Sequence, residues 1–237
     1  VIAYNFCDDK SVQGGILGSS IDTNHAPHGS FNLYEGNYVP RFQCDGYHGS
    51  ASHDTAFRNW FHGTSTVTNQ FWIPVNLNRF TRCYNIVGNV LGAKGHTWLY
   101  ENEQTGFSYD KHFIYSFGFP GMGNGWSNGK RAQLSKGKPW EDWDKLLSSP
   151  RGQGPGPNGF QELDLDVKAT TVLKGNYNYK DHGVPQSESL GGAKLPKSLY
   201  LKEKPAWFGN LAWPPFGPDV DFENSRIPAQ VRFEAMK

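Results

Sequence analysis

Short apolar runs that end in the same kind of bend recur along the chain. "SFNLYEGNY", "NIVGNVLG" and "TVLKGNYNY" each pass from strand-like residues into Gly-Asn and then into an apolar residue, and "VIAYNFC" and "TAFRNWF" are looser copies. The copies contain Asn5, Asn37, Asn59, Asn89 and Asn176. Asn suits a bend because its short amide bonds to nearby backbone groups. Each copy therefore predicts a short strand that ends in a bend.

The spacing of these copies predicts a stacked repeat. The first four asparagines are 32, 22 and 30 residues apart, within the range of about 20 to 50 residues that is typical of stacked repeats. Strands stacked about 4.8 Å apart would place the asparagines over one another, inward-facing and hydrogen-bonded as a ladder. This pattern predicts a parallel β-helix with loops of uneven length. The alternative is a β-sandwich, but the hairpin dipeptides that it requires are few.

The organisation changes near residue 118, which predicts three regions: repeat strands over 1–117, a Gly- and Pro-rich excursion over 118–160, and a final region over 161–237. Within the excursion, "KPWEDWDKLLSSP" predicts one short helix that Pro150 ends. "FQELDLDVKATTVLKGNYNY" then predicts a return to strands and a last copy of the bend. The proline-rich end cannot lie inside a sheet. We expect its aromatic residues to pack along the outside of the strands: Trp207, Phe208, Trp213 and Phe216.

Composition favours an extracellular protein. Only 19% of the 237 residues are charged, while 28 are Gly and 15% are aromatic, which suits a β-rich, loop-rich secreted chain. The net charge of +1 gives no electrostatic reason to expect nucleic acid or a membrane as a partner. The three cysteines, Cys7, Cys44 and Cys83, lack the spacing of a metal site. They are consistent with either one disulfide and one free thiol or three buried thiols.

Two parts of the sequence resemble a known superfamily. "ATTVLKGNYNY", "LPKSLYLKEKPAWFGNLAWPPFGPD" and "IPAQVRFE" resemble the C-terminal end of bacterial right-handed parallel β-helix proteins of the pectate-lyase-like superfamily, and "FNLYEGN…GSASHDTAFRNWFHG" resembles their preceding coils. The resemblance implies an all-β, right-handed, single-stranded solenoid with an irregular Pro- and Trp-rich end. It also makes a polysaccharide the expected partner. The superfamily includes lyases, hydrolases, epimerases, adhesins and phage tailspikes, so it does not name a reaction.

Residues 22–62 hold the candidates for chemistry. A uronate lyase needs a cation for the sugar carboxylate, a base, and an acid for the leaving oxygen. The cation would be Arg41 or Arg58, the base His48 or His53, and the acid Tyr47. The alternative is that these side chains only bond to loop backbone. Asp22, His25 and His28 are candidate metal ligands, and a divalent cation such as calcium is the one cofactor that the sequence suggests.

Two classes of function follow from these patterns. One is a secreted protein that acts on or binds polysaccharide, with lyase-like chemistry. The other is a non-catalytic extracellular β-helix with a structural, adhesive or filament-associated role. Val1 to Phe6 has the composition of a buried strand and no cap before it. We therefore expect its outer edge to pair with a second chain or with N-terminal coils of the same precursor.

Overall fold

Short parallel strands form three sheets in the computed structural model, which describes residues 1–8, 20–24, 28–44, 50–69, 72–102, 111–118 and 164–237. The first sheet contains, in order, β1 (Ile2–Ala3), β3 (Leu33–Glu35), β6 (Thr55–Phe57), β9 (Asn85–Val87) and β13 (Val172–Lys174). The second contains β4 (Tyr38–Val39), β7 (Trp60–Phe61), β10 (Val90–Leu91) and β14 (Tyr177–Asn178). The third contains β2 (Ile21–Asp22), β5 (Phe42–Cys44), β8 (Val75–Leu77), β12 (Phe113–Phe117) and β11 (Leu99–Glu101).

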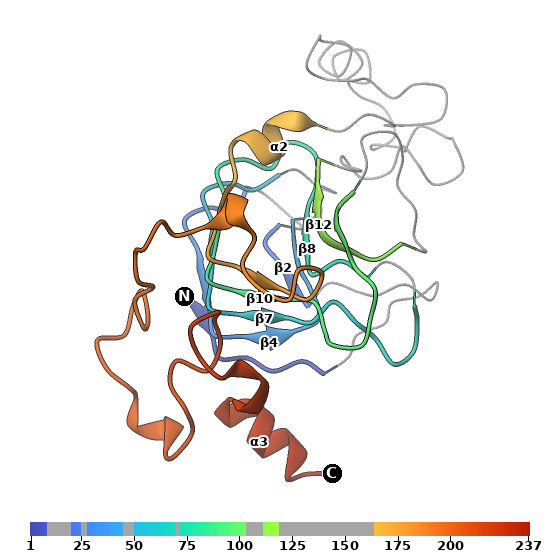
Figure 1. Cartoon of the computed structure of the whole chain (residues 1–237). Helices are drawn as coiled ribbons and strands as arrows, with labels where there is room; N and C mark the ends of the chain where they lie inside the picture. The colour runs from blue at the N-terminus through green and yellow to red at the C-terminus, as the bar shows by residue number, and fades with distance from the viewer. Residues whose placement is uncertain (9–19, 25–27, 45–49, 70–71, 103–110, 119–163) are drawn as a thin grey trace, which may run out of the picture.

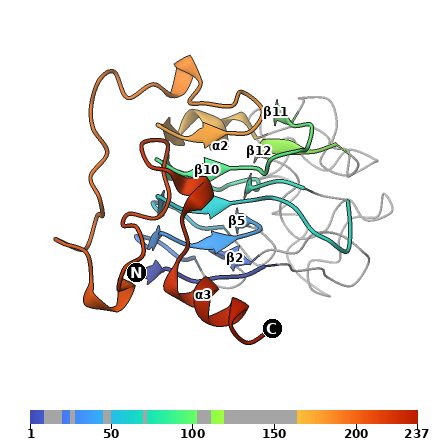
Figure 2. The same cartoon turned by 60° about the horizontal axis from the view of Figure 1, so that its bottom comes forward.

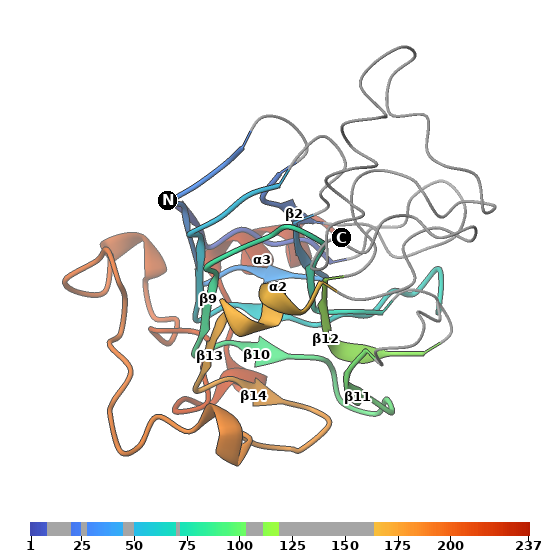
Figure 3. The ribbon, with the colours of Figure 1, turned by 90° about the horizontal axis from the view of Figure 1, so that it is seen from above.

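The chain visits the three sheets in a repeated order, and we call one such pass a round. In the second round β3, β4 and β5 follow one another, and in the third round β6, β7 and β8 pair beside them in parallel register. Figure 3 shows the sheets as three walls around a shared interior. The fourth round departs from this order, because β12 lies between β8 and β11. The expectation of a β-rich chain with parallel strands is thereby confirmed.

Aromatic side chains fill the interior between the sheets. The rings of Phe42 and Phe61 stack with centroids 5.4 Å apart, and both side chains are fully buried. Complete burial of one such ring contributes about 2 kcal/mol. Of the cysteines, Cys44 is buried in this core, and all three are free thiols. The sequence had left a disulfide open as an alternative.

The five asparagines form a column beside this core, as the sequence predicts. Asn5 Nδ2 donates to Asn37 Oδ1 at 2.9 Å, Asn37 to Asn59 at 2.8 Å, Asn59 to Asn89 at 2.9 Å, and Asn89 to Asn176 at 3.0 Å. The last four are fully buried. Asn5 makes the same bonds to Asn37 as the later members make to theirs, but it is exposed, because in the described part of the chain it belongs to the first round.

The residue before each asparagine has a left-handed backbone. The φ angles are 56° at Tyr4, 68° at Gly36, 51° at Arg58, 66° at Gly88 and 63° at Gly175. Glycine adopts this conformation without a steric penalty, whereas a side chain makes it costly. Three rounds therefore use Gly. The other two keep a large side chain, and both of these side chains hold the C-terminal part of the chain in place.

That C-terminal part, which we call the strap (residues 188–223), first descends along the ladder side of the stack. Leu190 lies over Gly175, Leu195 over Gly88, the Pro196 carbonyl over Arg58, and Leu199 beside Glu35. These contacts fall in successive rounds, from the fifth to the second. A side chain on Gly88 would come within 2.8 Å of Leu195. Glycine in the bends thus also makes room for the strap, which Figure 2 shows running beside all the rounds.

The strap then turns near the first round and returns. Phe208 packs edge-on against Tyr4 at 5.1 Å, and Trp213 donates its indole N–H to the Tyr4 hydroxyl at 3.0 Å. Phe222, in the 3₁₀ turn η4 (Phe222–Asn224), reaches Tyr177 of the fifth round at 4.9 Å. The other 3₁₀ turns are η2 (Gln186–Glu188) and η3 (Ala206–Phe208). The expected packing of Phe208, Trp213 and Phe216 outside the strands is confirmed, while Trp207 contacts Tyr4 and stays 56% exposed.

Two helices lie at opposite ends of the stack in Figure 1. One is α2 (Leu165–Ala169) and the other α3 (Pro228–Glu234). The sequence predicted strand where α2 lies, and for residues 165–169 this was wrong. Leu165 is 61% exposed and only Val167 of the helix is buried, so the alternation of Leu and Asp does not mark a half-buried strand. The helix expected within residues 139–150 lies outside the described residues.

The first round is covered on part of its surface. Phe6 contacts Phe233 of α3 at 5.2 Å, and the strap covers Tyr4. Val1 and Ile2 remain 69% and 45% exposed in the single chain. The expected partner at this edge stays a prediction. In the part of the chain that the structure describes, no helix combines the length and the apolar character needed to cross a bilayer.

Candidate functional site

Arg58 is a fully buried arginine that holds both passes of the strap. Its side chain makes a bidentate pair with Asp219, with two N–O distances of 2.8 Å. It also donates to the carbonyls of Pro196 at 2.7 Å and Phe216 at 3.1 Å. Burial alone would raise the pKa of Asp219, but the hydrogen bonds and charge of Arg58 outweigh burial and lower it. The planar guanidinium thereby joins β6 to two distant segments.

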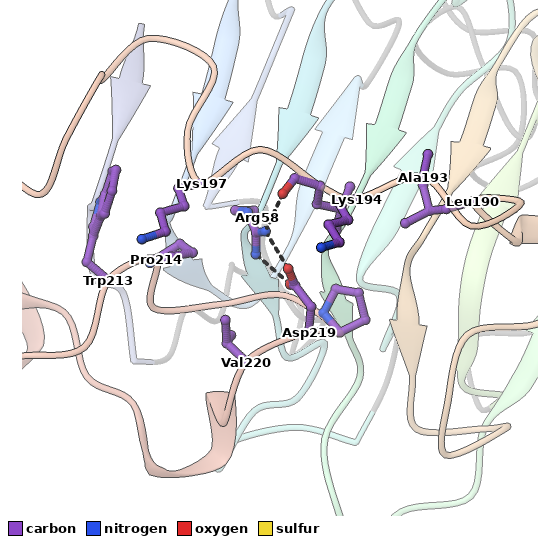
Figure 4. Close-up of a pocket in the computed structure, with 11 residues that line it drawn as sticks. Arg58, Leu190, Ala193, Lys194, Lys197, Trp213, Pro214, Asp219 and Val220 are labelled. Atoms are coloured by element: carbon purple, nitrogen blue, oxygen red, sulfur yellow. Dashed lines mark hydrogen bonds and ion pairs between the residues drawn. The ribbon is translucent and has the colours of Figure 1, made fainter.

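A hollow of about 530 Å³ opens above this arginine, between the two passes of the strap. We call it the basic hollow. Its walls include Leu195, Lys194, Lys197, Trp213, Pro214 and Asp219. In Figure 4, Lys194 and Lys197 lie on either side of Arg58, and Trp213 lies beyond Lys197. The Trp213 ring is held in place by its bond to Tyr4.

The charge of the basic hollow is positive. Arg58 and Asp219 neutralise each other, whereas Lys194 and Lys197 are exposed and form no ion pair with any carboxylate of the described chain. Two free ammonium groups beside a fixed aromatic ring can bind a carboxylate or sulfate on one side and a sugar ring on the other.

The lyase candidates predicted from the sequence are not brought together where the structure describes them. Arg58 lines the basic hollow, but its donors are committed to Asp219 and to backbone carbonyls. Arg41 is buried and donates to the Ile73 carbonyl at 3.1 Å. His53 lines a different hollow. Tyr47 and His48 lie outside the described residues.

The candidate metal ligands have separate partners. Asp22 accepts from Gln43 at 3.1 Å and from the Asn24 amide, whereas His28 bonds to the Ser52 hydroxyl at 2.7 Å. His25 lies outside the described residues. Among those that the structure describes, no group of three His, Cys, Asp or Glu residues is arranged to hold a metal ion.

Three buried carboxyl groups are absent from the walls of the basic hollow. Burial raises the pKa values of Glu35, Asp54 and Glu188. Each accepts hydrogen bonds from structural partners: Glu188, for example, accepts from Asn176 at 2.7 Å and from Tyr100 at 2.7 Å. Burial thus explains the raised pKa values of these three groups, and each has structural hydrogen-bond partners.

Sequence reasoning missed Lys194, Lys197 and Asp219 as site residues. The signal was "KLPKSLYLKEK", which places four lysines close together beside prolines and aromatic residues. It was interpreted only as part of a covering segment. No protein family, curated protein or solved structure matches this chain.

Proposed function

We propose that this chain is a secreted, right-handed parallel β-helix that binds an acidic polysaccharide in the basic hollow. The repeated visit to three parallel sheets in one order supports the solenoid. Parallel crossover connections are right-handed in about 98% of cases, which supports the hand. The low charge and abundant Gly and aromatic residues support secretion.

The observation that carries the ligand class is the pair of lysines without carboxylate partners beside Trp213 in a concave site. An acidic sugar has both features that such a site recognises, an anionic group and an apolar ring face. The resemblance to pectate-lyase-like proteins points to the same class of ligand. Binding is the activity that the geometry supports best, because Arg58, a predicted catalytic cation, is already neutralised by Asp219.

The test is the binding of oligogalacturonate by titration calorimetry. We expect Lys194→Ala/Lys197→Ala to weaken binding at least tenfold, and added salt to weaken the wild type, because exposed charges are screened over about 8 Å at physiological ionic strength. The matched control is Lys202→Ala/Lys204→Ala, which removes the same charge from the same strap outside the hollow. Equal losses in both double variants, or no binding by the wild type, would contradict the proposal.

Lyase action is tested with the same ligand by the ultraviolet absorbance of unsaturated products. If it occurs in the basic hollow, Lys194 or Lys197 supplies the cation, because Arg58 is neutralised by Asp219. Product formation that survives the double lysine substitution would place the reaction elsewhere on the chain.

A non-catalytic structural role is the second candidate, and the exposed edge at Val1 and Ile2 favours it. An unpaired strand edge can add another strand. Sedimentation velocity tests this candidate: association that Ile2→Lys abolishes would support it, and a monomer at all concentrations would contradict it.

A further inference from the structure

A second row of left-handed residues lies at the start of the first-sheet strands. Phe31, His53 and Cys83 have φ angles of 58°, 60° and 58°. They follow Ser30, Ser52 and Arg82, which pair across successive rounds. The three side chains therefore occupy equivalent positions, one above another, at the same corner of the stack.

This row forms one wall of a hollow of about 380 Å³, which we call the corner hollow. The next wall is made by Leu33, Thr55 and Asn85, which are in register as the first residues of β3, β6 and β9. Asn85 donates to the Thr55 hydroxyl at 3.1 Å. Leu199 of the strap closes the far side.

Burial does not explain the phenylalanine at position 31. Its side chain is 80% exposed, and it stacks on His53 with ring centroids 5.1 Å apart. The His53 ring is itself fixed, because its Nδ1 bonds to the Ser52 hydroxyl at 2.7 Å. A bulky residue in a left-handed conformation is costly, and an exposed ring contributes little burial in return. Such an outlier in a concave site suggests a role in binding.

The lining defines the ligand. None of the residues that line the corner hollow is Lys, Arg, Asp or Glu. It offers a stacked aromatic surface, the amides of Asn32 and Asn85, a hydroxyl, a thiol and two leucines. Aromatic faces bind the apolar side of a pyranose, and amide and hydroxyl groups bind its hydroxyls.

We propose that the corner hollow is a second carbohydrate site that binds an uncharged sugar ring, with Phe31 as its stacking platform. It extends the proposed function, since it supposes a carbohydrate ligand, but it uses none of the residues of the basic hollow. Together the two sites would favour a glycan that contains both acidic and neutral sugars.

The experiment is saturation-transfer NMR and calorimetry with uncharged pentasaccharides of glucose, mannose and galactose, and with pentagalacturonate. We expect at least one neutral pentasaccharide to bind the wild type. Phe31→Ala is expected to weaken that binding about tenfold, the loss of roughly one stacking contact. Lys194→Ala/Lys197→Ala is expected to leave it unchanged.

Phe31→Gly separates binding from folding. Glycine adopts the left-handed conformation without the steric penalty that Phe31 pays, so this variant is expected to be at least as stable as the wild type in urea and yet to lose the neutral sugar. The proposal is overturned if no neutral pentasaccharide binds the wild type, or if Phe31→Ala binds one as tightly as the wild type does. Neither outcome bears on the basic hollow, whose failure shows instead as a loss of pentagalacturonate binding.

Discussion

Replacing Arg58 by Ala tests whether one side chain fastens the strap to the sheets. The substitution removes the bidentate pair with Asp219 and the bonds to the Pro196 and Phe216 carbonyls. It gains nothing in the backbone, because Ala is also unfavourable at the φ of 51°. We expect the strap to open before the sheets unfold.

The size of the effect follows from the burial of the two partners. Removing one member of a buried, hydrogen-bonded charge pair costs about 3–5 kcal/mol. The Arg58 side chain is only 2% exposed, but that of Asp219 is 46% exposed and can be solvated when it is left alone. We therefore expect about 3 kcal/mol, at the lower end of that range. Asp219→Asn keeps the shape but leaves the buried Arg58 cation without a counter-charge, so we expect a cost of similar size, about 3 kcal/mol.

Limited proteolysis with trypsin measures the opening of the strap, because the strap contains the cleavage sites Lys194, Lys197 and Lys202. An opening made easier by 3 kcal/mol corresponds to cleavage on the order of a hundredfold faster when opening is reversible. Urea unfolding followed by tryptophan fluorescence gives the free energy, since Trp207 and Trp213 lie on the strap. Arg226→Ala is the control, because Arg226 is an exposed arginine near the same end of the chain.

Two results would refute the reasoning. One is an Arg58→Ala variant that trypsin cleaves as slowly as the wild type. The other is an Arg226→Ala variant that is destabilised as much as Arg58→Ala. Either would mean that the strap is held by its apolar contacts alone.

Three further predictions concern the column and the bends. Asn59→Ala leaves buried hydrogen-bond partners unsatisfied on both sides, so we expect it to lower the free energy of unfolding by about 3 kcal/mol. Asn5→Ala, at the exposed end of the column, is expected to lower it by under about 1 kcal/mol. Equal urea midpoints for the two variants would contradict a buried ladder. Gly88→Ala meets Leu195 at 2.8 Å, while Gly95→Ala has a similar φ but meets nothing within 4 Å, so only the first is expected to speed tryptic cleavage of the strap. Burial raises the pKa of Glu188 above its usual 4.5, so the folded state keeps this proton to higher pH and stability falls as pH rises from about 4.5 through the folded pKa. Glu188→Gln is expected to flatten that fall in urea midpoints between pH 4 and 8, and a curve parallel to the wild type would contradict it.

The bends could be predicted from the sequence because their chemistry is local. Asn37, Asn89 and Asn176 each follow a glycine that supplies the left-handed backbone, so the three residues of each bend identify it. The copy at Arg58-Asn59 lacks the glycine, and its place in the column depended on the spacing. An arginine at position 58, where other bends have glycine, indicates a special role for this side chain. From the sequence alone it was a candidate lyase cation, whereas in the structure it holds the strap.

The strap contacts could not be predicted from local patterns. Arg58 and Asp219 are 161 residues apart in the chain, and no spacing rule connects them. The basic hollow exists only because both passes of the strap meet over this pair. No sequence pattern therefore indicated that its lysines line a binding site. The helix α3 was also missed, although Pro228 at its first turn was a readable sign of a helix start.

The asparagine column has a direction. The bonds between side chains all run one way: each Nδ2 donates to the Oδ1 of the asparagine in the next round, and the series ends when Asn176 donates to the carboxyl group of Glu188, an acceptor. The buried asparagines also donate to a backbone carbonyl of the preceding round. Aligned amide dipoles polarise one another, so the column is electrically asymmetric along its whole length. At the opposite end, Asn5 presents an oxygen that accepts from nothing in the described chain. Two copies meeting first round to first round about a twofold axis would bring two such acceptor oxygens face to face, whereas a group with an N–H to donate would continue the series at this end.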